Sequence, residues 1–438
     1  MHQALERIRE AAKDRTKRFT ALFHHVYAVE LLRKGYFDLK RDAASGVDGE
    51  TWRHYGERLD ENLHDLSCRL RRGAYRARPA RRAYIPKTDG RQRPIGVMAL
   101  EDKIAQRAVT EVLNAIYEQD FLGFSYGFRP KRSAHQALDI LSAGLLTRKV
   151  SWVLDADILN FFGTLDWGWL IRCIERRIGD RRIIRLIQKW LKAGVLEEGK
   201  WTTSEVGTVQ GGSISPLLAN IYLHYVFDLW VHQWRKTRAE GDVIVVRYAD
   251  DFIVGFQYRR EAERFLADLR ERFARFGLAL HPDKTRILEF GRFARESRRR
   301  RGQGKPETFN FLGFTHICGR TREGKFTVLR KTMRTRLQAK LKEVYQELKR
   351  RMHDPVPEQG AYLRSVVRGH IRYYGVPMNG PSLAVFRKEV GRLWWKALRR
   401  RGQKHPLTRD RVERLVDRWL PLVRVCHPYP LVRIGVMT

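Results

Sequence analysis

Two adjacent carboxylates stand in the middle of an otherwise apolar stretch of the chain. Asp250 and Asp251 lie between the β-rich runs Val243–Arg247 and Phe252–Phe256, which predicts a hairpin with a four-residue turn. Like charges held this close repel and raise each other's pKa, and a divalent cation removes that penalty. Hard cations such as Mg²⁺ prefer carboxylate oxygens. The pair is compatible with a metal site, although a solvated Asp-Asp turn is the more frequent meaning of so short a motif.

A second pair of carboxylates, Asp155 and Asp157, lies two positions apart in a run that alternates like a β-strand. Both side chains therefore project from one face of the strand, and the other face is apolar. A strand with a polar outer face gives the same pattern. A strand carboxylate beside a hairpin that carries two more is, however, what two-metal phosphoryl transfer requires. We therefore expect two Mg²⁺ ions here, with Mn²⁺ as a possible substitute.

Two other stretches have residue types that suit a nucleoside triphosphate. Glycines before a helix start, in the run 210–220, let the backbone approach a ligand, although Ser215 and Pro216 also fit an ordinary helix start. Lys87 and Arg93 flank an Asp-Gly turn in a predicted β-hairpin. Lysine binds phosphate as a point charge and arginine as a planar fork, but in so basic a chain simple surface charge explains both residues equally well.

The composition indicates a globular protein with a polyanionic partner. The 438 residues suffice for two or three domains, and 86 Lys and Arg against 49 Asp and Glu give a net charge of +37. Such an excess indicates nucleic acid and argues against an ordinary metabolic enzyme. The four cysteines include no C-x-x-C pair, which excludes a disulfide scaffold and fits a reducing compartment. No apolar run suggests a membrane span, and the charged N-terminus does not resemble a signal peptide.

The elements that must position these residues form three regions. Residues 1–75 are predicted to be helical, followed by the hairpin and by a helix over 101–117. From 151 the pattern is a strand, two helices up to about 196, a helix over 216–234, the carboxylate hairpin, a helix over 260–276 and a strand over 285–290. This order predicts a mixed α+β sheet with helices on one face. Residues 294–306 are expected to be a basic flexible loop, and after 326 the pattern is almost entirely helical.

Seven motifs in a fixed order resemble the reverse transcriptases that bacterial group II introns encode, and the resemblance covers nearly the whole chain. The motifs are IPKTDGRQRPIGV, SYGFRPKRSAHQAL, DADILNFF, QGGSISPLLANIYLHYVFDLW, RYADD, HPDKT and FNFLGF. The later run 368–375 resembles the maturase (intron-splicing) region of the same family. Any one of these strings is weak evidence, but seven in order make a chance match very improbable.

The resemblance implies an RNA-directed DNA polymerase with a right-hand architecture. An N-terminal extension and fingers would occupy residues 1–150, a palm with a ferredoxin-like sheet 151–325, and a helical thumb with the maturase region 326–438. Its partners would be an RNA template, a DNA primer, deoxynucleoside triphosphates and group II intron RNA, whose splicing and mobility it would assist in the bacterial cytoplasm. Two alternatives stay open: a splicing cofactor with a silent polymerase site, and a reverse transcriptase used in host defence or DNA repair.

The same resemblance implies roles for individual residues. The metal ligands would be Asp157, Asp250 and Asp251, with Asp155 only a neighbour. The incoming nucleotide would contact four residues, of which Phe162 would reject a ribose 2′-hydroxyl: Lys87, Arg93, Phe162 and Gln210. Leu312 and Gly313 match the primer grip, and Lys284 matches the motif before it.

The sequence departs from the family pattern at two positions. Gly163 stands where Asp is usual, and Val209 where Pro is common. The lost acceptor at 163 is expected to loosen the strand-to-helix turn without removing a metal ligand, so polymerase activity should survive. Family members with a DNA endonuclease carry a C-terminal module rich in His and Cys, and the lack of such a module before Thr438 predicts no endonuclease.

Basic and aromatic residues alternate in the C-terminal region, around Trp394-Trp395. This mixture suits structured RNA through phosphate contacts and stacking on unpaired bases. A helix with Trp394 in the core and arginines on a solvated face is the ordinary alternative. We favour RNA contact because the whole chain is so positive, and the expected RNA-binding residues are Arg368, Arg372, Lys396, Arg399 and Arg400.

Overall fold

A four-stranded antiparallel sheet forms the centre of the protein. The structure is a computed structural model and describes residues 2–86, 92–197, 200–202, 206–208, 211–401, 408–433 and 435. The sheet has the order β6-β7-β3-β8, from β3 (Trp152–Asp157), β6 (Val243–Tyr248), β7 (Asp251–Phe256) and β8 (Arg286–Glu289). Helical segments connect β3 to β6 and β7 to β8. This is the β-α-β-β-α-β order of a ferredoxin-like sheet, as expected.

Both faces of this sheet are covered, so the prediction of helices on one face only was wrong. One face packs on α11 (Ser215–Leu223), α12 (Leu229–Thr237) and α13 (Arg259–Arg275), through Leu154, Phe252 and Phe256. The other face packs on α7 (Ala134–Thr147) through Val153 and Ile253. Val153 shares a face with the two carboxylates of β3, so only the far end of that face remains polar.

The N-terminal region is a helical body around α6 (Leu100–Asp120), one face of which is buried along almost its whole length. Around it lie α1 (His2–Ala12), α2 (Phe23–Val26), α3 (Val29–Phe37), α4 (Trp52–Glu57) and α5 (Leu59–Arg72). The predicted hairpin is confirmed as β1 (Ala80–Pro86) and β2 (Gln92–Val97). It belongs to a second sheet, β2-β1-β4-β5, that the sequence did not predict. Its other strands, β4 (Val195–Glu197) and β5 (Lys200–Thr202), are too short to show an alternation.

The connection from β3 to β6 is helical, and one of its helices is irregular. Three helices follow β3: α8 (Phe161–Thr164), α9 (Trp167–Glu175) and α10 (Arg181–Lys192). The long helix expected over 216–234 consists of α11 and α12 joined by one π-helical turn, η1 (His224–Asp228). A π turn of this kind often marks a functional site, because it changes which side chains share a face.

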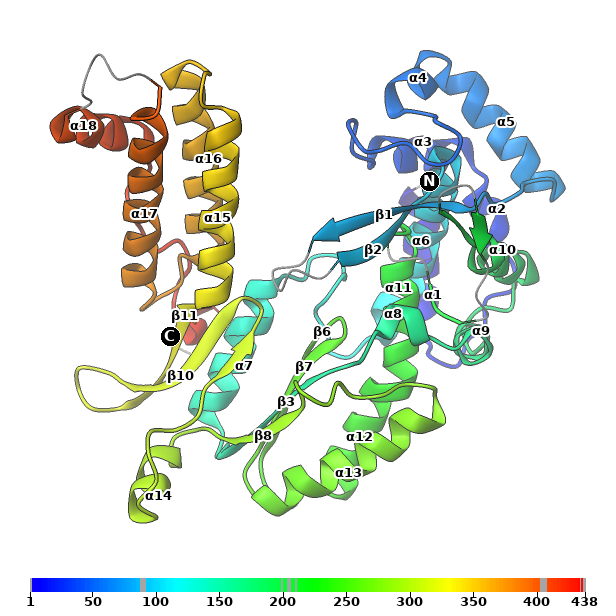
Figure 1. The fold of residues 1–438 in the computed structure, drawn as a ribbon. Helices are drawn as coiled ribbons and strands as arrows, with labels where there is room; N and C mark the ends of the chain where they lie inside the picture. Colours follow the sequence, from blue (N-terminus) through cyan, green and yellow to red (C-terminus); the bar gives the residue numbers. More distant parts are fainter. Residues whose placement is uncertain are drawn as a thin grey trace.

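The C-terminal region combines a small sheet with a helical bundle. The sheet contains β9 (Phe309–Phe311), β10 (Phe314–Arg320) and β11 (Phe326–Thr332), and the bundle contains α15 (Arg334–Arg350), α16 (Val356–Tyr374), α17 (Gly380–Leu398) and α18 (Arg409–Trp419). The short helix α19 (Pro430–Arg433) packs on α7. The β10–β11 hairpin spans the expected boundary at 325. In Figure 1 the bundle stands opposite β1, β2 and the N-terminal helices, with the central sheet below and between them.

Residues 294–306 are not simply a flexible loop, and that prediction was wrong. Residues Ala294–Arg300 form a helix, α14. Arg298 and Arg301 both form ion pairs with the buried carboxylate of Glu289. Two arginines of the basic run therefore hold this segment on β8 through their ion pairs with Glu289. In the described part of the chain, no helix is long and apolar enough to cross a membrane.

Candidate active site

The carboxylates singled out from the sequence meet at one end of the central sheet. Asp157, the last residue of β3, is the direct cross-strand partner of Asp251, the first residue of β7. Residues paired in this way have Cα atoms only about 4.5–5.5 Å apart. Asp250 precedes Asp251 in the turn between β6 and β7. The structure thus brings together the three carboxylates that the sequence had placed in two separate stretches.

The turn that carries Asp250 is tighter than expected. Tyr248 pairs with Asp251, so the strands leave a two-residue turn, Ala249-Asp250, and the predicted four-residue turn was wrong. Ala249 has a φ of 59°, in the left-handed region that tight hairpin turns require. For a residue with a side chain this conformation is strained and needs support from its surroundings.

Crowding perturbs the acidity of these groups. Desolvation, followed by the charges of Asp157, Asp250 and Asp155, raises the pKa of Asp251 to about 7. The Asp251 side chain is open to solvent, but the protein around it still removes enough water to disfavour the charged form. Desolvation also raises the pKa of Asp250, while the nearby charges of Arg93 and Lys284 oppose that rise. The cluster is therefore a place where additional positive charge is stabilising.

Lysine and arginine side chains supply part of that charge. The Lys284 ammonium forms an ion pair with the Asp157 carboxylate, and Arg286 lies 3.5 Å from Asp155. Within the described residues, no three His, Cys, Asp or Glu side chains are close enough to hold a metal ion as they stand. The donor set nevertheless fits a hard divalent cation, because three carboxylates, the ligands that such cations prefer, lie at one strand end. A cation bound there would compete with the Lys284 ammonium for the Asp157 carboxylate.

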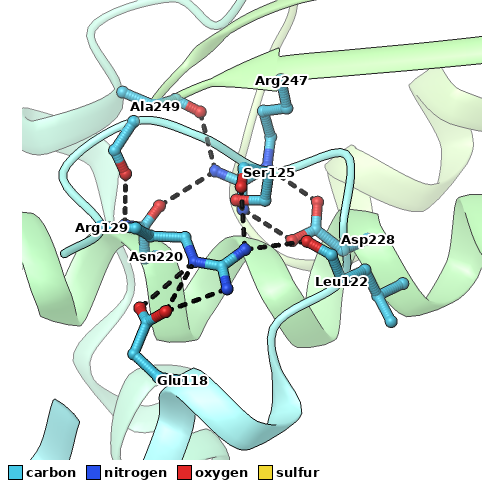
Figure 2. Close-up of polar contacts among 9 residues, drawn as sticks. Glu118, Leu122, Ser125, Arg129, Asn220, Asp228, Arg247 and Ala249 are labelled. Carbon is cyan, nitrogen blue, oxygen red and sulfur yellow. Dashed lines mark hydrogen bonds and ion pairs between the residues drawn. The ribbon is translucent and has the colours of Figure 1, made fainter. Parts of the chain in front are cut away.

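A buried arginine supports the strained turn from behind. Arg247 precedes Tyr248 and is fully buried, as is its partner Asp228. Its guanidinium donates two hydrogen bonds to the Asp228 carboxylate, at 2.7 and 2.6 Å, and one to the Ala249 carbonyl, at 2.9 Å. Figure 2 shows these contacts, with Ser125 and Asn220 completing the set. The carbonyl of the left-handed residue is thereby fixed by a charged donor in the protein interior.

The π-helical turn η1 explains how two residues of one helix reach the same guanidinium. Asn220 and Asp228 are eight positions apart and would point about 80° apart on a regular α-helix. One wider π turn takes up an extra residue and brings both onto nearly one face. Asn220 also donates to the Gly127 carbonyl, at 2.7 Å, in the loop before α7. This network was not predicted from the sequence, although a lone arginine inside an apolar strand was a usable signal.

A second buried arginine fixes the loop that supplies Ser125. Arg129 donates to the carbonyls of Leu122 and Ser125, each at 2.8 Å, and forms an ion pair with Glu118. Figure 2 shows it beside the Arg247 network. Ser125, whose hydroxyl accepts a hydrogen bond from Arg247, therefore has a fixed backbone.

The residues expected to contact a nucleotide are only partly described. Arg93 is exposed on β2 and close enough to Asp250 to influence its pKa. Phe162 is half-buried on α8 and lines a cavity of about 280 Å³ together with Arg82 and Pro94 from the hairpin. Lys87, Gln210 and Val209 lie outside the described residues.

The turn that contains Gly163 keeps its backbone hydrogen bonds. The Gly163 N–H donates to the Asn160 carbonyl, at 2.8 Å, and Thr164 donates to the same oxygen. A Cβ atom at 163 would lie 2.4 Å from the Asn160 side-chain amide. Glycine at this position therefore makes room for the Asn160 side chain, which lies over the start of α8.

Leu312 and Gly313 form the turn between β9 and β10, and the end of α16 supports it. Both have positive φ, 49° and 82°. The Tyr373 hydroxyl donates to the Leu312 carbonyl at 2.9 Å, and the Met333 N–H donates to the Gly313 carbonyl at 3.0 Å. A Cβ atom at 313 would lie 2.9 Å from the Tyr374 hydroxyl. The run that resembles the maturase region thus holds the turn that resembles the primer grip.

Alanine at Gly313 is expected to destabilise the protein more than alanine at Gly324. Gly324 has a φ of 80°, and a Cβ atom there would meet nothing within 4 Å, so Gly324→Ala adds only backbone strain, about 1 kcal/mol. Gly313→Ala must also displace Tyr374, which adds about 1 kcal/mol more. Equilibrium urea unfolding of both variants measures the difference. Equal losses would show that Tyr374 does not constrain the turn.

The five expected RNA-binding residues are all exposed on one part of the molecule. Arg368 and Arg372 belong to α16, Lys396 to α17, and Arg399 and Arg400 follow α17. Trp394 lies in the core of the bundle, which was the ordinary alternative to RNA contact for this residue. This ring is fully buried, and its N–H donates to Gln359 at 2.9 Å, so it offers no face to a base.

The sequence is similar to those of known proteins. A profile of the family described as "Reverse transcriptase (RNA-dependent DNA polymerase)" matches residues 85–316. Protein YkfC of Escherichia coli K12 is 33% identical over 315 residues, which cover 65% of this chain and 78% of YkfC. The group II intron-encoded protein LtrA of Lactococcus lactis subsp. cremoris is 36% identical over 225 residues, 50% of this chain and 37% of LtrA. The chain therefore matches most of the first relative and just over a third of the second.

Proposed function

Because the chain belongs to the reverse transcriptase family, the RNA-directed DNA polymerases, we propose that it copies RNA into DNA at the end of the central sheet where Asp157, Asp250 and Asp251 meet. The observation that carries the proposal is the cross-strand pairing of Asp157 with Asp251, beside a turn whose strain is supported by a buried arginine. A carboxylate cluster built in this way holds its charges close together at a cost in stability, which is typical of a catalytic site.

We assign the three regions of the right-hand polymerase architecture to this fold. The extension and fingers are residues 1–150, the palm is 151–325, and the thumb with the maturase region is 326–438. The primer and template would lie between the bundle α15–α17 and the β1–β2 hairpin, which stand on opposite sides of the carboxylate turn (Figure 1). The net charge of +37 supports a nucleic-acid partner along this surface.

The proposed roles of individual residues rest on the family motifs that they match. Asp157, Asp250 and Asp251 would hold two Mg²⁺ ions. Metal ions held there would supply Lewis-acid activation of the primer 3′-hydroxyl and charge stabilisation for the leaving pyrophosphate. Arg93, together with Lys87, would hold the triphosphate, and Phe162 with Gln210 would contact the sugar and base of a deoxynucleotide. Leu312 and Gly313 would position the primer end.

Asp251→Asn is expected to raise the melting temperature of the metal-free protein at pH 7.5. The pKa of Asp251 is about 7 in the folded protein, against an ordinary value of 3.8. Between these values the folded protein binds the proton more tightly than the unfolded protein does. Ionisation of Asp251 therefore destabilises the folded protein increasingly as the pH rises from about 4 to 7. Solvent screening of this accessible group limits the gain to about 1 kcal/mol, about 2 °C. The gain should vanish at pH 4, where the carboxyl is neutral.

Magnesium provides the complementary test by differential scanning fluorimetry. Mg²⁺ should raise the melting temperature of the wild type at pH 7.5 and have little effect on Asp251→Asn, because the variant lacks one ligand and its excess charge. An equal rise in both proteins would remove Asp251 from the metal site.

Primer extension is the direct test of the polymerase proposal. The wild-type protein should extend a DNA primer on an RNA template when Mg²⁺ and deoxynucleotides are supplied, and failure to do so would contradict the proposal. The name of LtrA describes a group II intron-encoded protein. We propose that this chain likewise binds group II intron RNA and assists its splicing and mobility in the bacterial cytoplasm. Unchanged splicing of the flanking intron near physiological salt would remove the splicing role.

A further inference from the structure

A basic hollow lies on the N-terminal body, away from the carboxylates. It has a volume of about 640 Å³, within the range of about 300–1,000 Å³ that is common for ligand pockets. Among the residues that the structure describes, no carboxylate lines it, and four cations do: Arg76, Arg185, Lys189 and Lys192. In Figure 1, α10 lies at the opposite side of the molecule from α15–α17, and the central sheet lies between them.

The sequence of α10 produces this hollow. Ile183, Ile187 and Trp190 are buried against the core, so the helix turns its other side to solvent. That side carries cations and a single amide, Gln188, at the positions that line the hollow. Lys189 donates to the Tyr75 carbonyl at 2.7 Å, which fixes the chain after α5 against the helix. Both walls of the hollow are therefore held in place by the fold.

Three of the cations are free to bind an anion. Among the described residues, none forms an ion pair or hydrogen bond with the side chains of Arg76, Arg185 or Lys192, and all three residues are exposed. Many other exposed cations of this chain pair with a carboxylate one helical turn away, as Arg259 does with Glu263. An unpaired group around one hollow is therefore a site of positive potential.

An exposed tryptophan stands at the edge of the same hollow. Trp201 of β5 has 59% of its surface exposed, more than any other tryptophan that the structure describes. Its indole N–H donates to the Ala193 carbonyl at 3.0 Å. A Cβ atom at Gly194 would lie 2.8 Å from the indole nitrogen, so the glycine lets the ring lie close against the backbone. The ring is thereby held in a fixed orientation before any ligand binds.

We propose that this hollow binds an unpaired segment of RNA, with one base stacked on Trp201 and the neighbouring phosphates on Arg76, Arg185 and Lys192. Aromatic rings stack on single-stranded bases, and arginine and lysine contact the backbone that joins them. A duplex offers no free base face to such a ring. The identification of the strand as RNA rests on the proposed function. The hollow would give the protein a contact with intron RNA that leaves the polymerase site open for template and primer.

The test uses the full protein already saturated with template and primer, so that the polymerase site is filled. Fluorescence anisotropy with a short, unstructured, labelled RNA then reports binding elsewhere. Trp201→Ala should weaken this binding about tenfold, and Trp201→Phe should recover much of it, because a ring remains. An RNA duplex of the same length should bind more weakly than the single strand. No loss in Trp201→Ala, or equal affinity for the duplex, would overturn the proposal.

Charge reversal tests the phosphate contacts against a matched control. The triple variant Arg76→Glu, Arg185→Glu, Lys192→Glu should lower the log–log salt slope of binding by about 2, since each lost contact on a single strand contributes about 0.7. The control makes the same change of charge on exposed residues of α12 and α13: Lys236, Arg270 and Arg275. An equal loss in the control would show only a non-specific effect of net charge and would overturn the site.

Primer extension separates this proposal from the polymerase assignment. Both hollow variants should extend a primer at the wild-type rate, because the hollow lies away from the carboxylates. If these variants lose RNA binding but extend the primer at the full rate, the result supports the hollow as a separate RNA-binding site. If the wild type extends no primer yet binds the RNA through Trp201, the polymerase proposal fails and the hollow stands. Loss of extension in parallel with loss of binding would assign these residues to the polymerase site and overturn a separate surface.

Discussion

Asp250→Asn is expected to extend a DNA primer on an RNA template at least about a thousandfold more slowly than the wild type. The substitution keeps the shape of the side chain and removes one carboxylate from the cluster around Asp157 and Asp251. Metal-ion catalysis supplies several kcal/mol of transition-state stabilisation, and about 4 kcal/mol corresponds to a thousandfold in rate. Single-turnover extension with saturating deoxynucleotide measures the effect on the chemical step.

Loss of folding cannot produce this result. Desolvation and the charge of Asp157 raise the pKa of Asp250, so a neutral amide there should leave the melting temperature unchanged or higher. Asp410→Asn, an exposed substitution in the first turn of α18, is the matched control and should extend at the wild-type rate. Equal rates for Asp250→Asn and wild type would remove Asp250 from the site.

Arg247→Ala should have the largest effect on stability, a loss of about 3–5 kcal/mol. Arg247 and Asp228 are both fully buried, so removal of the guanidinium leaves an uncompensated charge in the interior. Equilibrium urea unfolding measures the loss. The exposed pair Arg409–Glu413 provides the control, and Arg409→Ala should cost far less, because solvent screens this pair. A similar loss in both variants would mean that the buried pair has no special role.

A double variant separates stability from positioning. Replacement of both members of a buried ion pair by apolar residues is often nearly neutral, so Arg247→Met with Asp228→Leu should regain much of the lost stability. It cannot restore the hydrogen bond to the Ala249 carbonyl, which fixes the turn before Asp250. We therefore expect slow primer extension in a well-folded protein. A wild-type rate in the double variant would show that the network is only structural.

The parts of the fold that follow a clear pattern were predictable. The alternation in β3, the apolar runs of β6 and β7 and the Asp-Gly hairpin each identified an element, whereas the ferredoxin-like strand order was implied only by the family resemblance. Asp157 and Asp251 belong to segments far apart in the sequence, so local patterns could not show that they meet. The family resemblance, carried by the order of the motifs, predicted it. Periodicity could not detect β4 and β5, because each contains three residues and no buried side chain.

The other failures have physical causes that a single sequence hides. A run rich in arginine suggested a flexible loop, but two of its guanidinium groups pair with Glu289, a partner that only the tertiary fold supplies. The second covered face of the sheet was missed because Asp155 and Asp157 made the face that they share with the buried Val153 look polar. The support of the carboxylate turn depends on a π-helical turn, which no hydrophobic pattern reveals.

The position of a bound metal ion tests the central claim most directly. Crystals of the protein with an RNA template, a DNA primer, a deoxynucleotide and Mn²⁺ in place of Mg²⁺ would show the ion by its anomalous scattering. We expect an ion about 2 Å from carboxylate oxygens of both Asp157 and Asp250, with Lys284 released from Asp157. An ordered primer and nucleotide with Lys284 still bound to Asp157, and the ion held elsewhere, would contradict the metal site at this strand end.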